Sequence, residues 1–143
     1  MKQITFLKYV PEIEQAIIKE GIESLLDIAR KHTVKESLLI LPIEVLFANI
    51  EAYAMIQPLI DGHGHIIAHR MYFNSNYIFE KHILLKLTAH ETLHTLSETN
   101  ILKHQSLLFK SIALDYEMTN GIAIDCLTTE EIEMIERTMR IND

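Results

Sequence analysis

The sequence contains little cysteine, glycine or proline, and each shortage excludes a class of structure. Cys126 is the only cysteine among the 143 residues, so the chain can form neither an internal disulfide nor a zinc site built from cysteines. A lone cysteine suits a reducing compartment, and we expect a cytoplasmic protein. With four glycines, three prolines and 48% hydrophobic residues, the composition indicates a globular chain and not a disordered one. The length suits one domain, so we expect residues 1–143 to form a single domain.

Positive charge is also scarce. Lys and Arg number 13 and Asp and Glu number 20, which gives a net charge of −7. Without a cluster of Lys or Arg the chain lacks the basic face that neutralises phosphates, so we expect no nucleic-acid partner. Lys8 interrupts the N-terminal segment before the core of a signal peptide could form. The most apolar segment, residues 38–60, is broken by two glutamates and two prolines, so we expect no membrane span.

Residues 84–96 contain the pattern His-Glu-x-x-His, from His90 to His94. On a helix, residues four apart lie on one side, so the two imidazoles can share one metal ion. Glu91 lies beside His90, where its carboxylate can reach a metal-bound water. Zinc lowers the pKa of such a water to about 7, and a neighbouring carboxylate can take the proton as the water attacks a carbonyl. The pattern therefore predicts metal-assisted hydrolysis.

A pattern of five residues also occurs by chance, and the other interpretation is an amphipathic helix with two histidines on one side. The context favours a metal site. An apolar stripe that includes Ile83 and Leu87 continues at helical spacing into the two histidines. Polar groups on a core-facing stripe need partners, because burying them unpaired costs free energy. A metal ion supplies those partners.

The spacing of apolar residues predicts an α+β domain, mostly helical, with a small antiparallel hairpin or sheet before the motif helix. We expect strands at residues 53–60 and 65–73, joined by a turn at Asp61-Gly62. The expected helices are residues 11–31, 42–52, the motif helix from about residue 79, 101–119 ending at Asn120-Gly121, and 129–140 opened by a capping box of Thr128 and Glu131. For residues 42–52 the alternative is a strand over 38–47, because short apolar runs fit either structure.

A catalytic zinc ion usually has three protein ligands and one open position, and two residues after the motif are candidates for the third ligand. His104 has the better ligand type but lies in a polar segment. Asp115 lies in an apolar helical run, where a carboxylate needs a reason. On one helix the two would stand about 16 Å apart, so only one can bind the same ion. We favour Asp115 and keep His104 as the alternative.

These residues together resemble an HExxH zincin-type metallopeptidase. The chain is similar to the metallopeptidases associated with von Willebrand A-type domains over residues 61–120, in Asp61-Gly62, Met71-Tyr72-Phe73-Asn74, the motif, and Ile112-Ala113-x-Asp115-Tyr116. It also resembles the SprT-like proteases, in the motif followed by Lys103-His104 and Phe109.

The first resemblance implies Asp115 as the third ligand, and the second implies His104. Both imply one zinc ion, Glu91 as the general base, and an edge strand that pairs with an extended peptide or protein substrate. That edge strand is expected around Tyr72, Phe73 and Asn74. Tyr116 or a nearby histidine is a candidate for stabilising the oxyanion.

The sequence thus predicts a single zincin-like domain that hydrolyses a peptide bond with one zinc ion on His90, His94 and a third ligand. The alternative is a catalytically idle binding protein on the same scaffold, for example a phage or mobile-element protein that docks a host factor. A purely structural zinc site is a third possibility. Glu91 argues against it, because a structural site needs no base and fills its fourth position.

Overall fold

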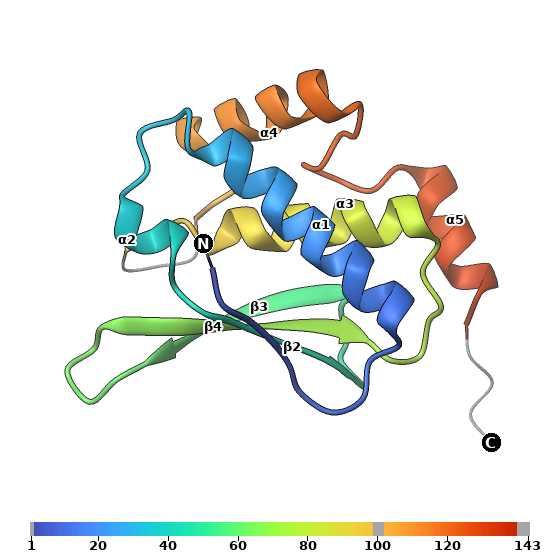
Figure 1. Cartoon of the computed structure of the whole chain (residues 1–143). Helices are drawn as coiled ribbons and strands as arrows, with labels where there is room; N and C mark the ends of the chain where they lie inside the picture. The colour runs from blue at the N-terminus through green and yellow to red at the C-terminus, as the bar shows by residue number, and fades with distance from the viewer. Residues whose placement is uncertain (1, 99–101, 140–143) are drawn as a thin grey trace.

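A computed structural model describes residues 2–98 and 102–139 of the chain (Figure 1). It confirms the α+β class. The strands are β1 (Ile4–Phe6), β2 (Ile43–Ala48), β3 (Ala54–Ile60) and β4 (Ile66–Asn74). The helices are α1 (Glu12–Ala29), α2 (Glu36–Leu39), α3 (Lys81–His94), α4 (Leu107–Asn120) and α5 (Thr129–Arg137). In Figure 1 α1 and α3 pack together over one face of the sheet, and α4 lies beyond them.

The sheet has four strands in the order β1-β2-β4-β3, and it is mixed. The predicted hairpin is confirmed, because β3 and β4 pair antiparallel. Its turn is held by the carboxylate of Asp61, which accepts the backbone N–H groups of His63 and His65 at 2.8 and 3.0 Å. β2 pairs in parallel with both β1 and β4, so the prediction of a small antiparallel hairpin or sheet holds for β3 and β4 and is wrong for the sheet as a whole.

The predicted helix at residues 42–52 is also wrong, because this segment contains strand β2. Ile43 and Val45 are fully buried and the residues that alternate with them are partly exposed, which is the period of a strand. Their pairing partners on β4 are His69 and Met71, far along the sequence. A segment of six residues can read as helix or strand, and this non-local pairing decides between them.

Helix α2, a four-residue helix, was not predicted, whereas α1, α3, α4 and α5 agree with the prediction except at their ends. α4 begins at Leu107 and not near residue 101, because Ser106 caps it by accepting the backbone N–H of Phe109 at 3.1 Å. The predicted start at residue 101 lies outside the described residues. Gly121 ends α4 with a φ of 73°, and the predicted capping box opens α5. α5 ends at Arg137, and residue 140 of its predicted range is not described. His104 therefore lies in a loop before α4.

The core lies between the sheet and α1, α3 and α4. Its largest fully buried side chains are Tyr116, Phe73, Phe109, Ile18, Ile22, Leu25, Ile43, Met71, Ile83, Leu84, Leu93 and Ile112. α1 approaches α3 closely at Gly21, where an added Cβ would lie 2.8 Å from Cβ of Thr88. Gly21 therefore sets the distance between the helix that carries the motif and α1. None of the described helices has the length and apolarity needed to span a bilayer.

Candidate metal centre

The structure brings three histidines together at the C-terminal end of α3. His90 and His94 lie one turn apart, and their Nε2 atoms are 3.3 Å apart. The loop before α4 adds His104, whose Nε2 lies 2.9 Å from Nε2 of His94. One ligand atom from each of the three residues lies within 4.8 Å of the others. The side chains are thus close enough to bind one metal ion.

Backbone carbonyls direct two of these rings toward the cluster. Nδ1 of His90 contacts the carbonyl of Ile124, and Nδ1 of His94 donates to the carbonyl of Leu102 at 2.7 Å. Because a carbonyl only accepts, we assign the ring hydrogen to Nδ1, which leaves the lone pair of a neutral imidazole on Nε2. This is how metal-binding histidines are usually oriented.

Nε2 of His94 lies 3.3 Å from Nε2 of His90 and 2.9 Å from Nε2 of His104, so a cation held among these nitrogens would interact with all three. A proton is disfavoured in this role. Burial, with the nearby His90, lowers the pKa of His94 to about 4. Burial likewise lowers the pKa of His90, although its contact with Ile124 opposes this. A metal ion therefore fits the donor set of three imidazole nitrogens better than a proton does.

Phe109 packs against all three histidine rings. It is buried in the first turn of α4, with its ring centroid 5.6 Å from His90, 5.3 Å from His94 and 4.8 Å from His104. The rings of Phe109 and His104 are stacked, with 17° between their planes. The sequence alone does not predict this role for Phe109. Its only sign was an aromatic residue shortly after His104 in a segment that resembles the SprT-like proteases.

Asp115, the expected third ligand, does not join His90 and His94 in the structure, and His104 takes its place in the cluster. Asp115 lies six residues after Phe109, about 120° around α4 from the face that meets the histidines. Its carboxylate accepts from Nε2 of His32 at 2.9 Å. That contact with His32, together with the nearby Lys31, lowers the pKa of Asp115. This pairing with the end of α1 explains a carboxylate in an apolar helical run.

The expected edge strand at Tyr72, Phe73 and Asn74 is also corrected. These residues belong to β4, which lies between β2 and β3, so their backbone is already paired on both sides. Phe73 is fully buried, and the Asn74 amide donates to the carbonyls of Ile50 and Ala52. They are therefore part of the scaffold and do not form an edge that binds a peptide.

Tyr116 does not face the histidines as an oxyanion donor would. It is 1% exposed, and its hydroxyl lies 2.9 Å from Oγ of Ser24 on α1. This contact joins α4 to α1 in the core, so Tyr116 has a structural place.

Glu91 is buried without a hydrogen-bond partner among the described residues. Its side chain is on α3 beside His90, and the residue is 7% exposed. Burial raises the pKa of Glu91 to about 7. A carboxylate in this state exchanges a proton near neutral pH, which is what a general base requires.

Metal-free Glu91→Gln protein is expected to be more stable than the metal-free native chain above pH 7. Because the pKa of Glu91 rises from 4.5 to about 7 on folding, the folded state disfavours the ionised carboxylate. The contribution of Glu91 to the free energy of unfolding of the metal-free native chain is therefore greatest below pH 4.5, and it is lost as the pH rises through 7. At about 1.4 kcal/mol per pKa unit, glutamine relieves a penalty on the order of 3 kcal/mol.

Urea unfolding with a chelator present, followed from about pH 5 to pH 8, measures this difference. Glu133→Gln on α5 is the control, because Glu133 is exposed and its amide is expected to leave the urea midpoint unchanged. Equal urea midpoints for the native chain and Glu91→Gln at pH 8 would contradict the burial cost of an ionised Glu91.

A pocket of about 220 Å³ opens beside His104. Its apolar wall is formed by α4, and Asp125 contributes from the segment between α4 and α5. It is lined by His104, Phe109, Lys110, Ala113, Leu114, Glu117 and Asp125. The histidine cluster is therefore adjacent to a space large enough for one side chain of a ligand.

Comparisons with protein-family models, with curated proteins and with solved structures find no match to this chain. The protein is therefore described by its own fold and by its cluster of histidines. It is an α+β domain that carries three histidines close enough to bind a metal ion.

Proposed function

We propose that this protein is a zinc-dependent peptidase with a zincin-like fold. The observation that carries the proposal is the convergence of three Nε2 atoms at the end of a helix that also carries Glu91, a buried carboxylate with no hydrogen-bond partner among the described residues. His90, His94 and His104 would hold the ion. A structural site needs a fourth protein ligand and no base, whereas this cluster offers three imidazoles, and Glu91 follows His90 on the same helix. Three nitrogen donors and no thiolate are compatible with zinc, and the motif favours zinc over other imidazole-binding metals.

The chain's own groups divide the work of hydrolysis between them. Zinc, when bound, acidifies a water molecule and polarises a carbonyl. Glu91 takes the proton from the attacking water, since its burial raises its pKa to about 7 and no hydrogen bond competes for it. Glu91 then passes this proton to the nitrogen of the leaving amine. The carbonyls of Ile124 and Leu102 keep the rings of His90 and His94 in place throughout.

The pocket beside His104 supports the assignment of a peptide as substrate. Its volume of about 220 Å³ suits one side chain, and its walls combine apolar groups with charged ones. Phe109 belongs both to this pocket and to the histidine cluster. A substrate side chain in the pocket would therefore lie next to the site of cleavage.

The proposal is tested by incubating the zinc-loaded protein with a mixture of peptides of random sequence and identifying new termini by mass spectrometry. We expect new termini that disappear with a chelator and return when zinc is restored. A protein that binds zinc in about a one-to-one ratio and leaves every peptide intact would favour the idle binding protein over the peptidase.

A further inference from the structure

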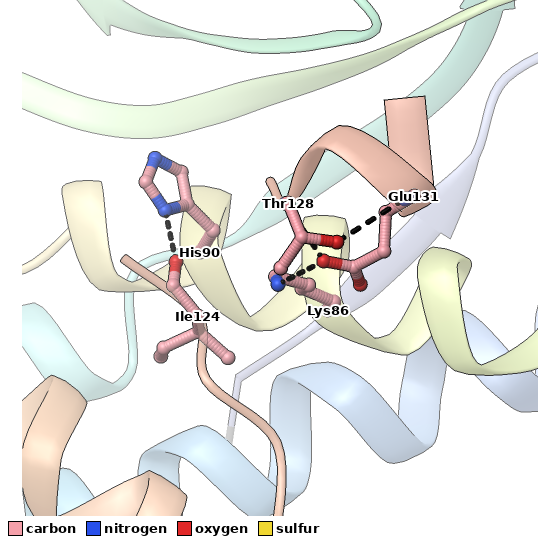
Figure 2. A network of polar contacts seen from close by, with 5 residues as sticks. All are labelled: Lys86, His90, Ile124, Thr128 and Glu131. Carbon is pink, nitrogen blue, oxygen red and sulfur yellow. Dashed lines mark hydrogen bonds and ion pairs between the residues drawn. The ribbon is translucent and has the colours of Figure 1, made fainter. Parts of the chain in front are cut away.

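The segment that joins α4 to α5, residues 121–128, is fastened to α3 at two points on one side of that helix. The first point is Ile124, whose side chain is 1% exposed and whose carbonyl contacts Nδ1 of His90. The second point lies four residues later, at Thr128, the N-cap residue of α5. Figure 2 shows both points, with Nε2 of His90 directed away from the carbonyl.

The second point is a buried ion pair. Nζ of Lys86 lies 2.6 Å from Oε1 of Glu131, and their side chains are 6% and 14% exposed. The same Oε1 accepts the backbone N–H of Thr128 at 2.9 Å (Figure 2). One carboxylate oxygen therefore closes the capping box of α5 and ties that box to α3. A buried ammonium needs such a partner, because an unpaired charge is costly to bury.

Lys86 and His90 are four residues apart on α3, so they lie on the same side of the helix. The joining segment thus runs along that side of α3. Ile124 contacts His90, and Glu131, just after the segment, contacts Lys86. Between the two points there are only three residues. The position of the Ile124 carbonyl therefore depends on where α5 is anchored.

We propose that Lys86 and Glu131 are positioning residues for His90. By anchoring the start of α5, they hold the Ile124 carbonyl against Nδ1 of His90 and so keep the ring hydrogen on Nδ1 and the lone pair on Nε2. Glu131 has a second effect, because it neutralises an ammonium that would otherwise repel a dication bound one turn away. This inference rests on the proposed metal site. It adds to that site the start of α5, which is distant from the motif in the sequence.

The test compares Glu131→Gln and Lys86→Met with the native chain. Two measurements are made: zinc affinity by competition with a chromophoric chelator, and the tautomer of His90 in metal-free protein by nitrogen NMR. Both variants are expected to bind zinc about 10- to 100-fold more weakly, as is usual when the groups that orient a ligand are removed. In both, His90 is expected to become a mixture of tautomers. A pair that only stabilised the fold would leave the tautomer unchanged.

Glu130→Gln is the matched control. Glu130 is exposed in the same turn of α5, and the change removes the same charge without touching Lys86. Its zinc affinity and the tautomer of His90 are expected to match those of the native chain. If Glu131→Gln leaves Lys86 unpaired and the protein does not fold, the double variant Lys86→Met with Glu131→Gln removes both charges and is measured instead.

Native affinity together with a fixed Nδ1–H tautomer in the folded variants would overturn the inference while leaving the proposed peptidase intact. If the native chain itself binds no zinc, the metal site and the proposed function fail. The NMR measurement then still decides whether Lys86 and Glu131 orient His90.

Discussion

Glu91→Gln is expected to lower kcat/KM for peptide hydrolysis by about 10²- to 10⁴-fold, the usual contribution of a general base. Glutamine keeps the size of the side chain but cannot take a proton from water. The three histidines are untouched, so zinc is expected to stay bound at about one ion per chain. Initial rates on a peptide found to be cleaved, measured with zinc content on the same samples, separate loss of the base from loss of the metal.

Glu133→Gln on α5 is the control for this experiment, because it makes the same chemical change at an exposed position. It is expected to cleave at the native rate. A Glu91→Gln protein that retains both zinc and full activity would remove Glu91 from the chemistry, and a different base would have to be sought. Loss of zinc along with activity would instead show that Glu91 supports the metal site.

The features that sequence analysis predicted correctly have local causes. In the motif helix and in α1, apolar residues recur at helical spacing. The hairpin is indicated by Asp61-Gly62 between two apolar runs. The capping box of Thr128 and Glu131 needs only residues three apart. In each case the residues that decide the structure are close neighbours in the chain.

The features that sequence analysis missed depend on distant partners. β2 is a strand because it pairs in parallel with β4, more than twenty residues away by the register of Ile43 with His69. Asp115 was predicted to be a ligand because no partner for its carboxylate is visible in the nearby sequence. Its partner, His32, lies 83 residues away along the chain. Spacing within a short window holds no information about either contact.

The third histidine shows the same limit at the site. His104 is an exposed residue among polar residues in a loop, and nothing around it in the sequence indicates that it joins the other two histidines. It reaches the cluster because Ser106 starts α4 immediately afterwards and Phe109 then packs against all three rings. The type of side chain predicted the third histidine better than its sequence context did. Imidazole is a more usual zinc ligand than carboxylate, whereas the apolar context of Asp115 favoured the carboxylate.

His104→Ala is expected to weaken zinc binding by more than the roughly 10- to 100-fold typical of losing a group that only orients a ligand, because it removes a donor from the ion itself. Two imidazoles would remain, too few for the three protein ligands of a catalytic zinc site. Asp115→Ala is the matched comparison and is expected to keep native zinc affinity, since its carboxylate pairs with His32. Zinc content after dialysis, followed by competition with a chromophoric chelator, measures both. If Asp115→Ala lost the ion and His104→Ala kept it, the cluster of His90, His94 and His104 would not be the metal site of the folded protein.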